Sequence, residues 1–175
     1  FRHKLGTTTE EDQLIFEEKS EAFTVSIGLS SDETYFFINT SDHNTNEQYY
    51  FHKNEKNPKP KIIKKREKGI IYSVNSWNGK FYNHTNKEAE DFKIDICDDL
   101  EVQNWKPYIA PKEEVLIGGL TFLKNWIIRG ETSNALGKIY VKNLETGIEK
   151  EIKFTDEKVI DPGLGLKQRD RNTDL

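Results

Sequence analysis

Residues Ile70–Tyr82 read IIYSVNSWNGKFY, and this stretch near the middle of the chain indicates how the chain folds. β-Branched and aromatic side chains, which favour the pleated sheet, stand on both sides of Asn78-Gly79. Asn-Gly is a strong two-residue hairpin signal, because a type I′ turn needs a positive φ at both of its central positions. The stretch therefore predicts two antiparallel strands joined by a tight turn.

Matching first and second strands occur at an interval of 46 residues on either side of this hairpin. The first strands of the three copies align on Ser26, Tyr72 and Gly118, and the second strands align on Phe36, Tyr82 and Ile128. Third strands are predicted at 48–52, 92–96 and 138–142, and fourth strands at 61–64, 105–109 and 150–154. Four short strands that recur every 40 to 50 residues are typical of the blades of a β-propeller.

The sequence therefore predicts an all-β fold, a partial β-propeller of about three four-stranded antiparallel blades with fragments of neighbouring blades. Residues 1–175 are expected to be a fragment of one propeller domain, with blades at 13–65, 66–112 and 113–155 and the start of a further blade at 156–175. Gly28, Gly118 and Gly119 lie in predicted innermost strands, where small residues let backbones approach closely. A β-sandwich of eight to twelve strands is the alternative. The best helix candidate, residues 86–91, is one or two turns long.

Composition narrows the function classes. The net charge of −4 lacks the basic excess of nucleic-acid-binding domains, so no nucleic-acid partner is expected. The longest apolar run, Val115–Leu123, is too short for a transmembrane helix, so no membrane partner is expected. A single cysteine, Cys97, and no visible leader pattern favour a reducing, cytoplasmic location. The absence of methionine leads us to expect an excerpt of a longer chain.

No catalytic, cofactor-binding or metal-binding residue is predicted. No two glycines stand four positions apart, so the G-x-S-x-G elbow of an α/β-hydrolase is missing from the sequence. Ser26, Ser73 and Ser76 look like ordinary strand residues, with no His–Asp pair indicated beside them. The four histidines have no metal-ligand spacing and are expected at the surface or in turns; they are His3, His43, His52 and His84.

Three other features each have a structural and a functional interpretation. Cys97 is expected to be a small buried side chain rather than a reactive thiol. The basic run Lys53–Lys68 is expected to be a solvated outer strand that protects a sheet edge, although it could bind an acidic surface. The tryptophans are expected in the core rather than along a peptide or sugar groove; they are Trp77, Trp105 and Trp126.

Several blocks of the sequence, in order, resemble the N-terminal domain of the prolyl oligopeptidase family of serine peptidases, and in particular its oligopeptidase B (protease II) type. The blocks are Phe1–Thr7, Leu14–Ile27, Ser31–Glu33, Thr40–His43, Arg66–Gly69, Tyr72–Val74, Asn104-Trp105, Asn143–Gly147 and Gly163–Gly165. No single block is specific, but the ordered set covers almost the whole chain.

The resemblance implies a seven-bladed propeller that covers an active site and admits short, flexible peptides. It implies a bacterial, cytoplasmic serine peptidase whose hydrolase domain cleaves after Arg or Lys. This chain would supply a non-catalytic part of the gate and would not be an enzyme by itself. The expected partners are a hydrolase domain in the same or a neighbouring chain and short peptides. The alternative is a residual or split-gene propeller module that acts only in self-association, as a homodimer through open blade edges, or in protein–protein interaction.

Overall fold

The computed structural model of the protein describes residues 1–153. The described chain forms two compact units, one made of residues 1–81 with 98–103 and the other of residues 82–97 with residues 104 onward. Its only helix within this range is the 3-10 turn η1 (Thr9–Glu11), and none of the described helices is long and apolar enough to span a membrane. The rest of its regular structure is β-strand.

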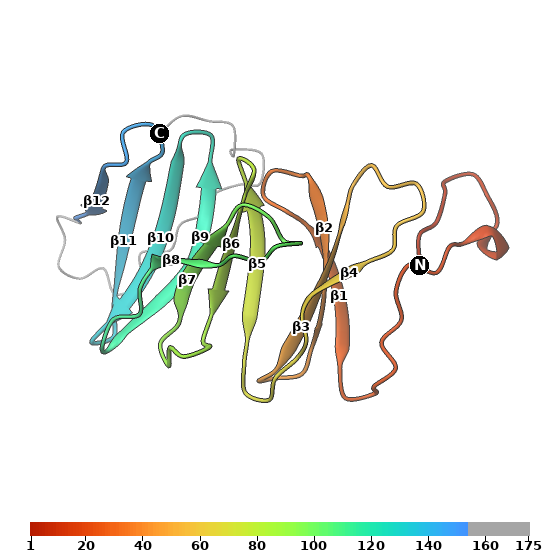
Figure 1. Ribbon diagram of the computed structural model, residues 1–175, viewed down its shortest axis with the longest axis horizontal. Coiled ribbons are helices and arrows are strands. Elements are labelled where there is room, and N and C mark those ends of the chain that lie inside the picture. Colours follow the sequence, from red (N-terminus) through yellow and green to blue (C-terminus); the bar gives the residue numbers. More distant parts are fainter. Residues whose placement is uncertain (154–175) are drawn as a thin grey trace. The chain divides into compact units, whose positions relative to one another are not determined.

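Twelve strands form three four-stranded antiparallel sheets, coloured in sequence order in Figure 1. The first sheet contains β1 (Thr24–Leu29), β2 (Tyr35–Ser41), β3 (Asn46–His52) and β4 (Lys61–Lys64). The second contains β5 (Tyr72–Trp77), β6 (Lys80–Thr85), β7 (Lys93–Cys97) and β8 (Lys106–Ile109). The third contains β9 (Val115–Leu123), β10 (Trp126–Ser133), β11 (Leu136–Asn143) and β12 (Glu149–Ile152).

In each sheet the strands are neighbours in sequence order, so every sheet is a simple meander. Each predicted strand overlaps a strand of the structure, and the prediction of three four-stranded antiparallel sheets is confirmed. The three sheets lie within the predicted blade ranges, but the blade boundaries themselves stay a prediction. Residues 86–91 form turns rather than a helix. The predicted further blade at 156–175 lies outside the described residues.

The Asn78-Gly79 turn is as the sequence predicts. Both residues have a positive φ, 51° at Asn78 and 70° at Gly79, and the turn joins β5 directly to β6. A second turn of the same kind joins β10 to β11 through Asn134 and Ala135, with φ values of 51° and 60°. Alanine seldom adopts this left-handed conformation, so the second hairpin carried no sequence signal.

Only one of the three glycines predicted in innermost strands makes a close backbone approach among the described residues. A Cβ at Gly118 would stand 2.8 Å from the carbonyl oxygen of Gly130 on the neighbouring strand β10. That contact lies beside the register shift between Arg129 and Glu131, where the two strands depart from regular pairing. A Cβ at Gly28 or at Gly119 would meet no described atom within 4 Å.

Each unit has its own apolar core. In the first unit, aromatic and aliphatic side chains of β2, β3 and β5 are buried, among them Phe37, Ile38, Tyr50, Phe51, Tyr72 and Val74. In the second unit, Leu123, Ile128 and Ile139 form a buried cluster against which Trp126 and Val141 pack. Strand β1 differs, because all six of its residues are exposed.

Candidate functional site

Three serines that the sequence places on strands, Ser26, Ser73 and Ser76, lie on β1 and β5 in the structure. Ser26 and Ser73 are exposed on strands, and Ser76 is buried but donates its hydroxyl to Asp32 Oδ2 at 2.7 Å. A nucleophilic serine needs a histidine that accepts its proton, and none of these three serine hydroxyls is hydrogen-bonded to a histidine ring of residues 1–153. The polar chemistry of the described chain is instead concentrated in three clusters that join its strands.

The first is the Asp32 cluster, in the turn between β1 and β2. Asp32 Oδ1 accepts hydrogen bonds from the Ser30 hydroxyl at 2.7 Å and from the Thr34 backbone N–H at 3.1 Å, while Oδ2 accepts from Ser76. The Ser31 N–H donates to Asn75 Oδ1 at 2.8 Å. Ser30 and Ser76 are each 1% exposed, so this cluster connects the first sheet to the end of β5 through buried hydroxyl groups.

The electrostatics of the Asp32 cluster favour an ionised carboxylate. Burial by itself raises the pKa of Asp32. Hydrogen bonds donated by Ser30, Ser76 and Thr34 outweigh that effect, so the pKa of Asp32 is lowered from its ordinary value of 3.8. Asp32 therefore acts as a charged acceptor that holds several donors in place.

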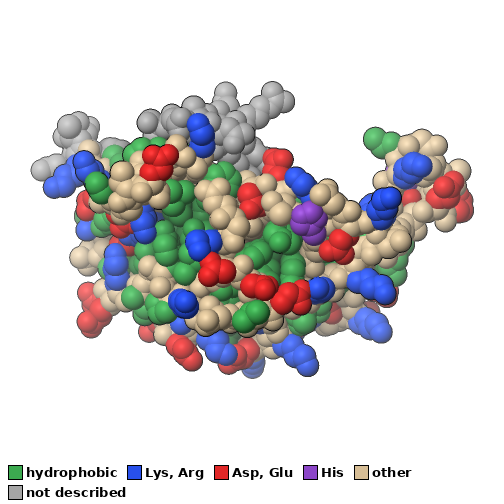
Figure 2. All heavy atoms as spheres, turned by 45° about the horizontal axis from the view of Figure 1, so that its top comes forward, with side chains coloured by type: hydrophobic (Ala, Val, Ile, Leu, Met, Phe, Trp, Pro, Cys, Tyr) green, Lys and Arg blue, Asp and Glu red, His purple; other side chains and the backbone are tan. Residues whose placement is uncertain are grey.

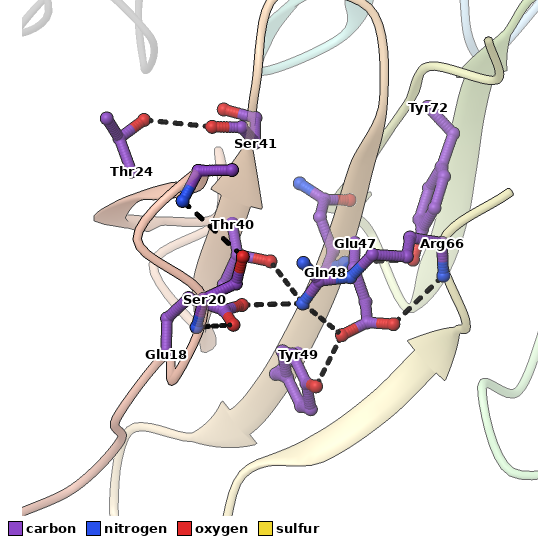
Figure 3. Close-up of polar contacts among 11 residues, drawn as sticks. Glu18, Ser20, Thr24, Thr40, Ser41, Glu47, Gln48, Tyr49, Arg66 and Tyr72 are labelled. Atoms are coloured by element: carbon purple, nitrogen blue, oxygen red, sulfur yellow. Dashed lines mark hydrogen bonds and ion pairs between the residues drawn. The ribbon is translucent and has the colours of Figure 1, made fainter. Parts of the chain in front are cut away.

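The second is the Arg66 cluster, in which a guanidinium lies between two carboxylates (Figure 3). Arg66 Nη2 is 2.5 Å from Glu18 Oε2 and 3.2 Å from Glu47 Oε1, and its guanidinium carbon lies 3.9 Å from the centre of the Phe23 ring. Tyr49 donates its hydroxyl to Glu47 Oε1 at 2.5 Å. The cluster thereby fastens the segment before β1 to β3 and to the loop after β4.

The charges of the Arg66 cluster support one another. The Ser20 backbone N–H and the Arg66 guanidinium lower the pKa of Glu18. Burial raises the pKa of Glu47, but hydrogen bonds from Tyr49 and Arg66 outweigh it and lower that pKa below 4.5. Burial and the nearby Glu47 carboxylate raise the pKa of Tyr49 to about 12. All these groups keep one protonation state at neutral pH, which suits a structural tie better than proton transfer.

The third is the Arg129 cluster in the third sheet. Arg129 Nη1 and Nη2 make a two-pronged contact with the Glu149 carboxylate at 2.8 and 3.0 Å, and its Nε donates to Glu131 Oε1 at 2.9 Å. Lys112 Nζ also contacts Glu131, at 2.6 Å, and the Arg129 guanidinium carbon lies 4.8 Å from the Tyr140 ring centre. The Arg129 and Glu131 side chains are 4% and 3% exposed, so their charges depend on each other.

An apolar groove of about 280 Å³ lies on the first sheet and is called the β1 groove here. Val25 and Ile27 of β1 line it, and they are 50% and 58% exposed. Phe16 of the segment before β1 also lines the groove and packs on Tyr49, with ring centres 4.6 Å apart. Val25, Ile27 and Leu29 alternate along β1 and form an exposed apolar row, which marks a face suited to association.

The basic run Lys53–Lys68 contains the outermost strand of the first sheet, β4, as the sequence predicts. Lys61 is exposed and contacts Glu101. One member, Arg66, departs from the prediction of a solvated run, because it is the centre of the Arg66 cluster. Figure 2 shows Lys and Arg side chains interspersed with Asp and Glu side chains on the face in view.

The histidines and Cys97 have ordinary structural surroundings. His3 Nδ1 lies 2.6 Å from Asp12 Oδ1 at the surface. The prediction of a surface or turn position does not hold for His84, which is half-buried on β6, stacks on Phe92 and donates its Nε2–H to the Ile117 carbonyl at 2.7 Å. Cys97 is 4% exposed, which confirms the prediction of a small buried side chain. The described residues contain no group of three or more His, Cys, Asp or Glu side chains arranged to hold a metal ion.

The tryptophans largely follow the prediction of core packing. Trp77 is 6% exposed, and Trp126 packs against the buried cluster of the third sheet. Trp105 is half-buried. None of the three lines the β1 groove.

The sequence matches, over residues 1–170, the family model described as the N-terminal β-propeller domain of prolyl oligopeptidase. It is 26% identical to protease 2 of Moraxella lacunata over 141 residues, which cover 81% of this chain and 20% of that protein. It is 25% identical to dipeptidyl aminopeptidase BI of Pseudoxanthomonas mexicana over 147 residues, which cover 79% of this chain and 20% of that protein. The chain thus spans about a fifth of the length of these curated relatives.

Solved structures agree on the fold. Oligopeptidase B from Trypanosoma brucei, in its closed form with covalently bound antipain, superposes with a TM-score of 0.79 at 20% identity, over 89% of this chain and 23% of that chain. Oligopeptidase B from Leishmania major superposes with a TM-score of 0.78 at 18% identity, over the same shares of the two chains. The prediction of a partial β-propeller is confirmed, and the β-sandwich alternative is wrong.

Proposed function

This chain belongs to the prolyl oligopeptidase family as a part of its N-terminal β-propeller domain, and we propose that it is a non-catalytic section of a peptide gate. In related proteins this propeller belongs with a hydrolase domain. The proposed partner is such a domain, in the same or a neighbouring chain, that cleaves short peptides after Arg or Lys. The propeller section limits which peptides reach it.

The observation that carries this proposal is the way the Asp32 cluster ties the first sheet to β5. A gate that excludes folded proteins has to keep its wall closed while small peptides enter. Buried hydroxyl-to-carboxylate bonds such as Ser76 to Asp32, at 2.7 Å, resist separation because each buried partner would lose its hydrogen bond. The Arg66 cluster adds a second tie, between β3 and the segment before β1.

The test compares this chain by itself with the assembled enzyme, which is this chain together with the proposed hydrolase domain. The substrates are a fluorogenic dipeptide that ends in Arg and the same dipeptide sequence placed in a folded carrier protein. We expect no turnover by the 175-residue chain. The assembled enzyme should cleave the free dipeptide rapidly and leave the carrier intact, both folded and heat-unfolded, because a gate that admits only short peptides excludes a long chain in either state.

Two results would overturn the proposal. One is dipeptide turnover by the 175-residue chain that survives repurification to constant specific activity. The other is cleavage of the carrier protein by the assembled enzyme at a rate close to that of the free dipeptide, since a gate has to discriminate by size.

A second candidate function, self-association without peptidase activity, is favoured by the exposed apolar face of β1. Six consecutive exposed residues and the β1 groove leave apolar surface that a second copy of the chain could cover. Light scattering on the purified chain tests it. A discrete dimer supports this candidate, and a stable monomer at micromolar concentration counts against it.

We also propose a cytoplasmic location and a bacterial source. The support for the first is the use of a single cysteine, which is buried at position 97. Fractionation of the source cells, with antibodies against this chain, tests it; recovery in a secreted or periplasmic fraction would contradict it.

A further inference from the structure

A second hollow in the first unit has a different chemistry from the β1 groove. It measures about 320 Å³ and is called the Tyr35 hollow here. Its walls come from the start of β2, the end of β3, the loop after β3, the start of β6 and the loop at 98–101. Aromatic residues and charged residues both line it, and the aromatic ones include Tyr35, Tyr50, His52 and Phe81.

One wall of the Tyr35 hollow is aromatic. The Tyr35 ring is central, with its centre 5.3 Å from that of Phe81, 5.5 Å from that of His52 and 6.1 Å from that of Tyr50. The three neighbouring rings are tilted or edge-on to it, at 59°, 88° and 66° respectively. A ring face that borders the hollow attracts a cation through its negative quadrupole. Tyr35 and His52 are half-buried and offer more of their rings to a ligand than Tyr50 and Phe81, which are 8% and 6% exposed.

The rim of the hollow is acidic. Four carboxylates and one ammonium group line it, which leaves an excess of three negative charges; these groups are Glu55, Asp98, Asp99, Glu101 and Lys61. Lys80, which does not line the hollow, contacts Asp98 at 2.6 Å and offsets part of that charge. The carboxylates act on the aromatic wall. Burial raises the pKa of Tyr35 most, and the negative charges of Asp32 and then Asp99 raise it further. Burial likewise raises the pKa of Tyr50, and the Glu101 carboxylate adds to that effect.

The chain already places one of its own cations at this rim. Lys61 Nζ lies 2.5 Å from Glu101 Oε1, the same oxygen that accepts a hydrogen bond from the Tyr50 hydroxyl at 3.0 Å. The Lys61 and Glu101 side chains are 59% and 60% exposed, so this pair is accessible and easily exchanged. A cation brought by a ligand would compete with Lys61 for the same carboxylate.

A metal ion does not fit this rim, because the described residues hold no group of three carboxylates or imidazoles arranged for one. A planar organic cation fits both walls. A guanidinium group stacks on aromatic rings and donates two parallel hydrogen bonds to a carboxylate, whereas an ammonium group is a compact point charge without that planar, two-pronged geometry.

We propose that the Tyr35 hollow binds the guanidinium of an arginine side chain in a peptide, between its aromatic wall and its acidic rim. The identification of the ligand as a peptide rests on the proposed function, whereas guanidinium binding by the hollow does not. A hollow of this kind would hold a basic peptide on the propeller section, apart from any contact with a hydrolase domain.

The test is a nuclear magnetic resonance titration of the isotope-labelled 175-residue chain with N-acetyl-arginine amide. The matched ligand is N-acetyl-citrulline amide, which has nearly the same shape without the charge. We expect a dissociation constant on the order of millimolar for the arginine probe, with shifts centred on residues 52–55 and 98–101, and no saturable shift with citrulline. Binding should weaken as salt is added.

Two substitutions should act in opposite directions. Asp99→Asn removes one negative charge and should weaken binding about two- to fivefold. The asparagine still has a side-chain oxygen that can accept the hydrogen bond that the Glu101 backbone N–H donates to Asp99. Lys61→Gln removes the competing cation and should strengthen binding by a similar factor. Glu145→Gln, at an exposed carboxylate that does not line the hollow, should leave binding unchanged.

Equal affinity for the arginine and citrulline probes would overturn the inference, and so would shifts that avoid the Tyr35 hollow. Weaker binding by Lys61→Gln would also contradict it. Because these measurements use no substrate turnover, guanidinium binding can fail while the gate proposal holds, and the gate proposal can fail while guanidinium binding is observed.

Discussion

The bond between Ser76 and Asp32 offers the sharpest test of how the first sheet is joined to β5. The perturbation is a double-mutant cycle of Asp32→Ala, Ser76→Ala and the double variant. Asp32→Ala removes an acceptor that serves Ser30, Ser76 and the Thr34 N–H. Ser76→Ala removes one donor and leaves Asp32 with its other two.

The expected magnitudes follow from burial and charge. A hydrogen bond to a charged acceptor contributes about 1.5–3 kcal/mol, and a buried polar group left without its partner costs about 1–3 kcal/mol. Asp32→Ala leaves the hydroxyls of Ser30 and Ser76 without this acceptor, and both are 1% exposed, so we expect a loss of about 3–5 kcal/mol. Ser76→Ala should cost about 1.5–2 kcal/mol, and the coupling energy should be about 1.5 kcal/mol.

The assay is urea denaturation followed by tryptophan fluorescence, with the free energies compared at a common slope. The pH dependence gives an independent check. Because the folded-state pKa of Asp32 is lowered from 3.8, its contribution is complete above that value and is lost as the pH falls through the lower folded pKa. The deficit of Asp32→Ala should therefore shrink in acid. Additive single effects, within about 0.5 kcal/mol, would refute the reasoning.

Three further predictions concern backbone conformation and one buried imidazole. Ala135→Gly should stabilise the protein by up to about 1 kcal/mol in thermal unfolding, because Ala135 has a φ of 60°; a destabilised variant would contradict this. Gly118→Ala should destabilise the protein by about 1–3 kcal/mol, because the added Cβ would lie 2.8 Å from the Gly130 carbonyl oxygen. Gly119→Ala is the control and should change the stability little, because its added Cβ would meet no atom of residues 1–153 within 4 Å; equal effects of the two substitutions would contradict the prediction. Burial lowers the pKa of His84 from 6.5, so the unfolded chain takes up a proton more readily than the folded one and stability should fall as the pH drops below 6.5. His84→Gln should lose this pH dependence when the melting temperatures at pH 7.5 and pH 5 are compared.

The strands of this protein could be predicted because their signals are local. Asn78-Gly79 needs a positive φ at both residues, and the structure has it at both. Short runs rich in Ile, Tyr and Phe, separated by turn residues, marked the strands, and the near-regular interval between copies indicated blades. The Asn134-Ala135 turn could not be predicted from its residue types, because alanine does not favour a positive φ and the paired flanking strands impose it there.

The polar clusters could not be predicted in the same way. Asp32 and Ser76 are far apart in the sequence, as are Glu18 and Arg66, so no spacing rule links them. The basic run that contains Arg66 indicated a solvated face. Arg66 instead becomes a half-buried tie, because carboxylates from two other segments lie beside it. The Tyr35 hollow likewise draws its rings and carboxylates from five separate stretches.

Sequence alone therefore determined the all-β class, the four-strand repeat and the membership of the family, since turn chemistry, strand propensity and ordered blocks are all written along the chain. Tertiary structure alone decided which charged and polar side chains meet. A buried ion pair or hydroxyl-to-carboxylate bond depends on distances of about 3 Å between residues that the chain separates by dozens of positions, and only the packing of the strands sets those distances.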